Sequence, residues 1–263
     1  MPAPSSVLPA PAPAIVKFLP SYVGSKRFWL PALRHLTGRP FVELFAGSAV
    51  LSANLASTAL LVDLDPVVCH VLSNFDEQKV PEVFTRADYY RVRFGTDWRN
   101  YLFCLQGMSY SGVFRYSDRG FNVPAKGGQY PTAPSVDEIR VRPAYLSALA
   151  RWRALGATVR HGSYAEVTDA QIAALGTDVV VVLDPPYQGS RAAYNKPEAN
   201  SIDYERYWSR VADLSSRFDL VLFDRESNLL QRGYPITATR KMRVNGARAG
   251  DIEAMSLVPR TSG

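Results

Sequence analysis

The chain has 263 residues, of which 47% are hydrophobic and 21% are charged, a composition typical of a soluble globular protein. No apolar run reaches the roughly 18 residues that span a bilayer. The two cysteines, Cys69 and Cys104, exclude a disulfide framework and a cysteine-rich zinc site. These features predict a cytoplasmic protein with one large domain, or one domain with an insertion.

The net charge is +6, and most of the excess lies in two segments. Residues 106–160 contain eight Lys or Arg against three Asp or Glu, and residues 225–250 contain six against one. This distribution suits a polyanionic partner such as nucleic acid, and ordinary solvated faces are the alternative. In the second segment, Arg240, Lys241 and Arg243 are candidate contacts to a nucleic acid backbone.

Residues 1–14 contain five prolines and predict a disordered Pro/Ala tail without the features of a signal peptide. Next, residues 25–38 predict a short helix with Ser25 as its N-cap and Gly38 as its stop. An alternation of strand, turn, helix and strand then covers residues 40–75 and indicates a parallel sheet. We expect strands over 40–45 and 59–65, with helices over 51–57 and 66–75.

The alternation stops at residue 76. Residues 76–107 look helical without a buried strand, and residues 108–134 are too long for a plain connection, which indicates a functional insertion. After a helix over 143–154, the expected elements are strands over 157–164, 178–183 and 219–224, helices over 168–175 and 203–214, and two antiparallel strands over 235–244 and 252–258. The domain prediction is therefore a catalytic domain over 15–75 and 154–263, interrupted by an insertion over 76–153.

Three predicted strands end on residues that could bind a ligand or take part in a reaction. In open α/β sheets, ligands bind beyond the carboxyl ends of the strands. In "FAGSA", Gly47 would let the backbone approach a ligand closely, although small residues are common at such turns. Asp63 could accept two hydrogen bonds from a ribose diol; the alternatives are a loop-facing acid or a cap of the helix at Pro66. Because no phosphate-binding loop is present, a phosphate-free adenosine ligand such as S-adenosylmethionine fits best.

The third strand ends in "DPPY". Pro185 and Pro186 lack an N–H and have a restricted φ, so their carbonyls would stay free and fixed. With the Asp184 carboxylate they can hold an exocyclic amine, and Tyr187 offers a flat face for a base taken out of the stack. The alternative is a rigid turn with Asp184 as a cap.

With these motifs in order, the chain resembles the Dam-type amino-methyltransferases, which make N6-methyladenine in DNA. "FLPSYVGSK" resembles their methionine-site motif, "FVELFAGSAV" their glycine motif, and "HGSYAE" their contact to the adenine end of the cofactor. "YSGVFRYSDRGFNVP" resembles their target-reading hairpin, "VVLDPPY" their catalytic motif, and "RVNGARAGDIEAMSL" their closing hairpin. The motif order is that of the alpha class.

The resemblance implies a Rossmann-like α/β sheet of the S-adenosylmethionine-dependent methyltransferases, with an inserted, mainly helical target-recognition region that carries a hairpin. It implies methyl transfer from S-adenosylmethionine to N6 of a flipped adenine in double-stranded DNA at a short specific site, without a metal. A restriction endonuclease of the same system is a candidate partner. The implied catalytic residues are Asp184, Pro185, Pro186 and Tyr187. The implied cofactor-binding residues are Tyr22, Gly24, Lys26, Glu43, Phe45, Gly47, Asp63, Ser163, Tyr164 and Asp184. The implied DNA-binding residues on the hairpin are Tyr110, Ser111, Arg115 and Arg119.

The sequence departs from the family at several positions. Ala49 stands where the family has the second glycine of its FxGxG motif, and Ser21 and Tyr22 replace a lysine- or tryptophan-bearing entry to the first motif. Ser111 replaces an asparagine of GATC-reading relatives, and the hairpin is one residue shorter, so the target sequence stays open. The alternatives are an N4-cytosine or RNA adenine methyltransferase, or a non-catalytic DNA-binding protein that kept the fold. The aspartate in "DPPY" favours adenine, because cytosine enzymes more often carry serine there.

Overall fold

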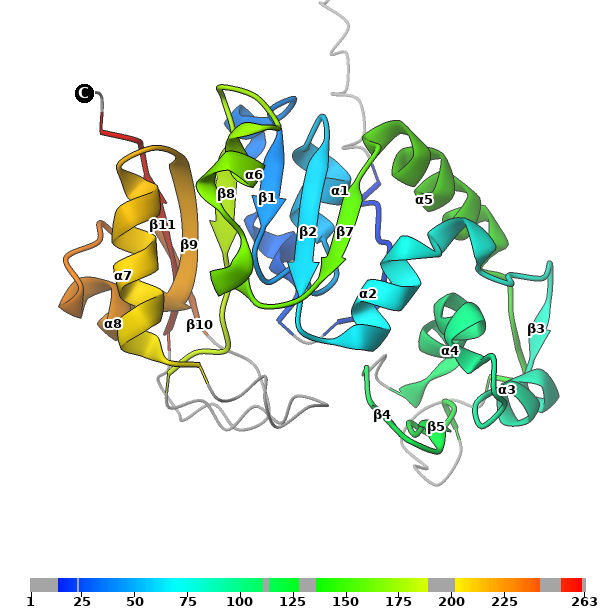
Figure 1. The fold of residues 1–263 in the computed structure, drawn as a ribbon. Coiled ribbons are helices and arrows are strands. Elements are labelled where there is room, and N and C mark those ends of the chain that lie inside the picture. Colours follow the sequence, from blue (N-terminus) through cyan, green and yellow to red (C-terminus); the bar gives the residue numbers. More distant parts are fainter. Residues whose placement is uncertain are drawn as a thin grey trace, which may run out of the picture.

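The computed structural model describes residues 14–22, 24–110, 114–127, 136–188, 202–241 and 252–261 (Figure 1). Apart from residue 14, the predicted Pro/Ala tail lies outside the described residues. No described helix is long and apolar enough to cross a membrane. Both cysteines are free thiols in the interior.

A seven-stranded sheet forms the centre of the molecule, in the order β10-β11-β9-β8-β1-β2-β7. The strands β7, β2, β1, β8 and β9 are parallel, and β11 runs antiparallel between β9 and β10. This arrangement confirms the predicted Rossmann-like α/β sheet with a final antiparallel pair. The strands are β1 (Phe41–Glu43), β2 (Ala59–Asp63), β7 (Thr158–His161), β8 (Val180–Leu183), β9 (Asp219–Arg225), β10 (Ala238–Lys241) and β11 (Ile252–Val258).

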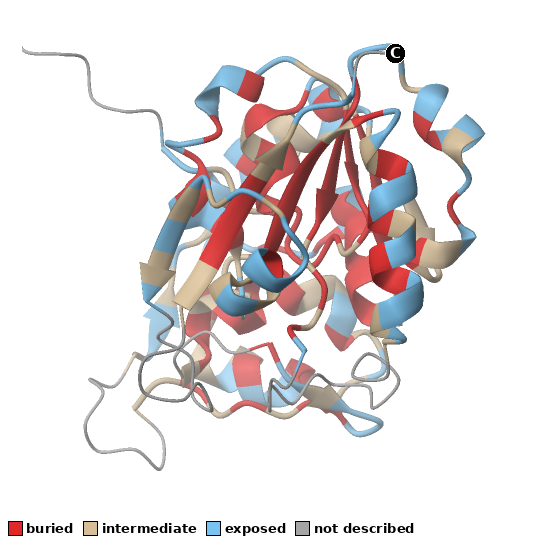
Figure 2. Cartoon of the chain, turned by 90° about the vertical axis from the view of Figure 1, so that its left-hand side faces the viewer, coloured by how far each residue is buried: buried red, intermediate tan, exposed pale blue. Residues whose placement is uncertain are grey.

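Helices cover both faces of the sheet, which explains why its central strands read as continuous apolar runs. In β8, Val180 and Val182 belong to one hydrophobic core, and Val181 and Leu183 belong to a second. The first core includes residues of α1 (Val50–Leu55), α2 (Pro66–Ser73) and α5 (Arg142–Leu155). The second includes residues of α6 (Asp169–Ala173), α7 (Tyr204–Ser215) and α8 (Glu226–Gln231). Figure 2 shows the buried strands between these helices.

The strand order reverses between β1 and β8. From β1 the chain adds β2 and β7 on one side, and it then returns to place β8 and β9 on the other. The carboxyl ends of β1 and β8 therefore meet at a topological switch point, where open α/β sheets bind ligands. These ends lie at the lower edge of the sheet in Figure 1.

The segment between β2 and β7 adds further elements beside that edge. After η3 (Phe75–Glu77) come β3 (Phe84–Thr85), α3 (Arg86–Val92), η4 (Trp98–Tyr101), α4 (Leu102–Met108), β4 (Tyr116–Ser117), β5 (Gly120–Phe121) and β6 (Glu138–Ile139). The antiparallel pair β4–β5 confirms the predicted hairpin. The expectation of no buried strand over 76–107 is wrong: Phe84 is buried in β3, which pairs with β6.

The hairpin is tied to the carboxyl edge of the sheet. The Tyr116 hydroxyl donates a hydrogen bond to Oδ1 of Asp65 at 2.7 Å. The ring of Phe114 lies 5.5 Å, centroid to centroid, from the ring of Tyr22. The predicted hairpin is therefore in direct contact with the predicted cofactor side of the molecule.

The helix predicted over 25–38 is instead two 3-10 turns, η1 (Lys26–Trp29) and η2 (Arg34–Leu36). Pro31 lies between them, and proline lacks the N–H that a continuous α-helix needs. Ser25 occupies the N-cap position of η1, as predicted, but its side chain makes no capping hydrogen bond. The short helix α8 was not predicted.

We predict that Gly120→Ala will destabilise the protein more than Gly38→Ala. Both glycines have a positive φ, +117° and +89°, so alanine costs on the order of 1–2 kcal/mol at either position. A Cβ at Gly120 would also lie 2.3 Å from the backbone oxygen of Arg93, whereas nothing lies within 4 Å at Gly38. Urea denaturation of both variants measures the difference in the free energy of unfolding. Equal losses of stability would show that the hairpin moves away from the new Cβ without an energetic cost.

Candidate active site

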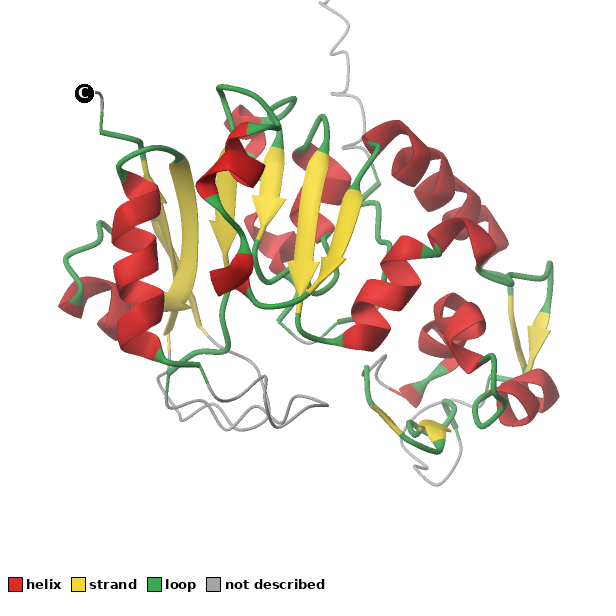
Figure 3. Cartoon of the chain, in the orientation of Figure 1, coloured by secondary structure: helices red, strands yellow, loops and turns green. Residues whose placement is uncertain are grey.

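The carboxyl ends of four neighbouring strands lie at the lower edge of the sheet in Figure 3, and each has an acidic residue at or next to it. Glu43 ends β1, Asp63 ends β2, Asp184 follows β8, and Asp224 lies one residue before the end of β9. Burial raises the pKa of Glu43 to about 7 and the pKa of Asp63, Asp184 and Asp224 to about 6. Perturbed acids concentrated in one place are typical of functional sites, and these would be stabilised by a cationic ligand.

Asp63 holds the turn that follows β1. Its carboxylate accepts hydrogen bonds from the backbone N–H of Gly47 at 2.7 Å and of Asp65 at 2.8 Å. The cap of α2 is Asp65, whose side chain accepts from Val67 and Val68, so the alternative of Asp63 as a helix cap is wrong. A carboxylate has about four acceptor positions, which leaves Asp63 free to bind hydroxyl groups as well.

The turn itself requires glycine at its centre. Gly47 has a φ of +47°, and a Cβ there would lie 2.8 Å from Cε1 of Tyr22. Ala49 has φ +49° and ψ +32°, the left-handed conformation that glycine adopts most readily. The departure from the family's second glycine therefore places an alanine in a strained backbone position at the start of α1.

Phe45 of the predicted glycine motif lies close to Tyr164, which was predicted, together with Ser163, to contact the adenine end of the cofactor. Phe45, just after β1, lies 5.1 Å from the ring of Tyr164, which follows β7. The Ser163 hydroxyl accepts a hydrogen bond from the N–H of Ala165 at 3.2 Å. Phe45 and Tyr164 thus form an aromatic pair in the second hydrophobic core, after β1 and β7.

A buried lysine holds the predicted catalytic motif "DPPY". Nζ of Lys26 lies 2.7 Å from Oδ2 of Asp184 and 3.2 Å from Oε1 of Glu253, and it donates to the carbonyl of Gly24 at 2.8 Å. The Tyr187 hydroxyl donates to the same Glu253 at 2.6 Å. We refer to Lys26, Asp184, Tyr187 and Glu253 as the Lys26 cluster.

The charges of the Lys26 cluster support one another. Burial alone would lower the pKa of Lys26, but Asp184 and Glu253 outweigh it and raise the pKa above its usual value. Burial opposes ionisation of Glu253, yet Lys26 and Tyr187 hold its pKa below the usual range. Burial is the main cause that raises the pKa of Tyr187, and the negative charges of Asp184 and Glu253 raise it further. The hydroxyl therefore stays protonated and remains a hydrogen-bond donor. With Asp184 ionised, the cluster carries one net negative charge.

The two prolines of "DPPY" differ in their surroundings. The Tyr204 hydroxyl donates a hydrogen bond to the carbonyl of Pro186 at 2.5 Å, so the expectation of two free carbonyls is wrong for Pro186. The carbonyl of Pro186 thus anchors the loop to α7, whereas the carbonyl of Pro185 has no hydrogen-bond donor among the described residues.

The predicted DNA contacts lie on two separate surfaces. Arg115 and Arg119 are exposed on the hairpin, where Nε of Arg115 donates to Oδ1 of Asn122 at 3.0 Å. Tyr110 is half-buried and packs against the first core. Arg240 and Lys241 lie on β10. Ser111 and Arg243 lie outside the described residues.

The sequence analysis missed Glu253 and Asp224 as site residues. Glu253 interrupts the otherwise apolar strand "IEAMSLV", and a lone acid in such a strand is a signal that it has a partner. Asp224 is fully buried near the end of "DLVLFD", in the position that drew attention to Asp63. Among the described residues, no three or more His, Cys, Asp or Glu side chains gather as metal ligands would.

No family model matches the chain, and none of the curated proteins matches it. Among solved structures, the rRNA methyltransferase aviRa from Streptomyces viridochromogenes is 11% identical with a TM-score of 0.41, over 92% of this chain and 89% of that chain. An RNA methyltransferase from Salinibacter ruber in complex with S-adenosyl-L-homocysteine is 9% identical with a TM-score of 0.34, over 89% and 90%. The putative methyltransferase yhhF from Escherichia coli is 10% identical with a TM-score of 0.36, over 89% and 82%. Similarities of this size carry no argument about function, which we therefore argue from the residues of this chain.

We predict that Glu43→Gln will gain stability relative to the wild type as the pH rises from about 4.5 to about 7. The folded protein raises the pKa of Glu43 to about 7, so its stabilising contribution is present below the unfolded value of 4.5 and is lost on going to about 7. The glutamine keeps an oxygen for the Ser52 N–H and carries no charge. At about 1.4 kcal/mol per pKa unit, the gain approaches 3 kcal/mol.

Urea denaturation at several pH values measures this gain. Glu77→Gln makes the same change at an exposed position and serves as the control for loss of one charge. A constant difference between Glu43→Gln and the wild type across this pH range would contradict the assignment.

Proposed function

We propose that this protein transfers a methyl group from S-adenosylmethionine to the N6 amine of a flipped adenine in double-stranded DNA, at a specific short site. The observation that carries the proposal is the acceptor pair at the switch point. Asp184 and Pro185 directly follow the carboxyl end of β8, Tyr187 interacts with the Asp184 carboxylate, and among the described residues no donor reaches the carbonyl of Pro185. Such a pair matches an amino group with two N–H donors.

The acidic edge of the sheet favours S-adenosylmethionine over a dinucleotide. A sulfonium cofactor is cationic and has no phosphates, so Glu43, Asp63 and the net negative Lys26 cluster would attract it. A pyrophosphate would instead bring negative charge to the four acids at this edge. We assign Tyr22, Gly24 and Lys26 to the methionine end, Glu43 and Gly47 to the middle, and Asp63 to the ribose. Phe45, Ser163 and Tyr164 take the adenine end.

S-adenosylmethionine, when bound, supplies an electrophilic methyl group. Asp184 and Pro185 bind the two N–H groups of the substrate amine and orient its nitrogen. Lys26 occupies Oδ2 of Asp184, which leaves Oδ1 for the substrate. The amine loses a proton to solvent as it gains the methyl group, and Asp184 stabilises the positive charge that develops on nitrogen. With a pKa of about 6, Asp184 is mostly ionised at pH 7 and accepts hydrogen bonds.

Two surfaces support a DNA partner. The hairpin β4–β5 is a two-stranded ribbon, a shape that fits the major groove, and it presents Arg115. We assign Arg115 to guanine reading, with contact to phosphate as the alternative. Tyr110 and Ser111 are the candidates to fill the gap left by the flipped adenine. Arg119, Arg240, Lys241 and Arg243 are assigned to the backbone.

The central test is Asp184→Ala. We expect loss of methyl transfer, because the variant lacks the acceptor that positions the amine, while Lys26 keeps Glu253 and the Gly24 carbonyl as partners and the fold survives. Transfer from labelled S-adenosylmethionine is measured on duplex DNA, on RNA of the same sequence and on cytosine-only DNA. Asp213→Ala, at an exposed site on α7, is the control. Methylation of RNA or cytosine alone by the wild type would refute the DNA adenine assignment, and near-normal transfer by Asp184→Ala would refute the role of Asp184.

A second test concerns the cofactor. Asp63→Asn should weaken binding of S-adenosylmethionine by about 1–3 kcal/mol, because a ribose hydroxyl loses its charged acceptor. Calorimetric titration measures the affinity. Asp76→Asn makes the same change at an exposed residue of η3 and should leave the affinity as it is. If both variants bind S-adenosylmethionine equally tightly, Asp63 only holds the Gly47 turn and does not bind the ribose.

A further inference from the structure

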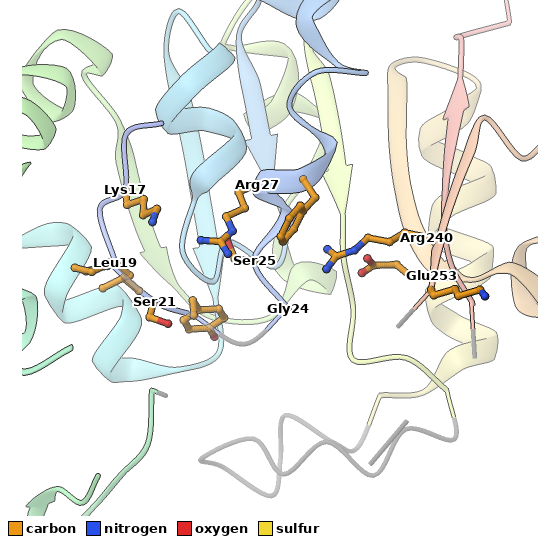
Figure 4. A pocket seen from close by; sticks show the side chains of 12 residues that line it. Lys17, Leu19, Ser21, Gly24, Ser25, Arg27, Arg240 and Glu253 are labelled. Atoms are coloured by element: carbon orange, nitrogen blue, oxygen red, sulfur yellow. The ribbon is translucent and has the colours of Figure 1, made fainter. Parts of the chain in front are cut away.

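A basic hollow lies beside the Lys26 cluster (Figure 4). Its volume is ≈ 200 Å³, and its walls come from the N-terminal segment 17–28 and from β10 and β11. The charged residues of its lining are Lys17, Arg27, Arg240, Lys241 and Glu253. Glu253 is already paired with Lys26, so the four cations of the hollow have no acid of their own in its lining.

Two of these cations are held by an aromatic ring. Cζ of Arg240 lies 3.7 Å and Cζ of Arg27 lies 4.9 Å from the ring centre of Phe28. Phe28 is 54% exposed, which is unusual for a large apolar side chain. Among the described residues, no carboxylate lies within 4 Å of either guanidinium. The ring therefore fixes two guanidinium groups whose donor edges remain available to an anion.

The hollow adjoins the proposed amine pocket. Glu253 lines the hollow and also binds Lys26 and the Tyr187 hydroxyl. Tyr22 and Gly24 likewise line the hollow, and the Gly24 carbonyl accepts from Lys26. A base that leaves a duplex stays joined to a phosphate on each side, so a strand whose base enters the amine pocket must bring phosphates close to it.

We propose that this hollow binds the phosphodiester backbone of the DNA strand that carries the target base, with Arg27 and Arg240 as phosphate ligands supported by Phe28. The inference rests on the proposed function and makes the substrate a polynucleotide instead of a free nucleoside. It also gives the exposed phenyl ring a role, because arginine on an aromatic face keeps a fixed geometry for bidentate contact to phosphate.

The test measures binding of a fluorescent DNA duplex to the full-length chain over a series of salt concentrations. Arg27→Ala/Arg240→Ala removes both phosphate ligands, and Phe28→Leu removes only the aromatic support. Arg34→Ala/Arg206→Ala removes two charges at exposed positions away from the hollow and is the matched control. Single-stranded DNA and RNA of the same sequence form the other arms, and calorimetric titration with S-adenosylmethionine checks the fold and the cofactor site.

Each phosphate contact contributes about 0.9 to the slope of log affinity against log salt on duplex DNA. We expect Arg27→Ala/Arg240→Ala to flatten that slope by about 1.8 and to weaken duplex binding about tenfold or more at low salt. Phe28→Leu should weaken binding to an intermediate degree, and affinity for S-adenosylmethionine should stay unchanged.

Four results would overturn the proposal. The control could flatten the slope equally, which would make the effect one of net charge. In Arg27→Ala/Arg240→Ala the salt slope of duplex binding could stay unchanged while the affinity for S-adenosylmethionine falls, which would show that the hollow binds the cofactor. The slope could change on RNA alone, which would replace DNA by RNA as the strand. Phe28→Leu could bind duplex DNA with the wild-type affinity while Arg27→Ala/Arg240→Ala shows the same salt slope and affinity as Arg34→Ala/Arg206→Ala. A flattened slope in a chain that methylates no adenine would support the hollow and refute the proposed function.

Discussion

The site depends on the enclosure of one ammonium group by two carboxylates. Lys26 is 7% exposed, and a buried charge without a partner costs several kcal/mol. Asp184 and Glu253 supply that partner from the loop after β8 and from β11. Three segments far apart in the sequence are thereby joined at one point. Loss of Lys26 would leave two carboxylates without a cation in the interior, whereas loss of either carboxylate leaves an ion pair with Lys26.

This junction determines where the "DPPY" loop can lie. Asp184 is fixed by Lys26, Pro186 by the Tyr204 hydroxyl, and Tyr187 by Glu253. Three of the four residues of "DPPY" are thus immobilised by side chains from elsewhere in the fold. The Pro185 carbonyl has no donor among the described residues, so Asp184 and Pro185 are the acceptors that we propose for the substrate amine.

The sequence predicts the central strands β1, β2, β8 and β9 well, because they are short apolar runs with an acid at or next to their carboxyl ends. It also leads to Asp63 and Asp184, since an acid at the end of a buried strand has few structural reasons to be there. The prediction fails where neighbours in space are distant in the chain. The partner of Lys26 on β11 cannot be read from local pattern, and Pro31 divides what helical periodicity alone would join.

Asp65 makes hydrogen bonds to two different parts of the molecule. Its Oδ1 caps α2 through Val67 and Val68, and the same oxygen accepts from the Tyr116 hydroxyl of the hairpin. Its own N–H donates to Asp63, the residue assigned to the cofactor ribose. A displacement of this loop at one end is therefore transmitted to the other. By thermodynamic reciprocity, whatever the hairpin gains from an occupied cofactor site, the cofactor gains from an engaged hairpin.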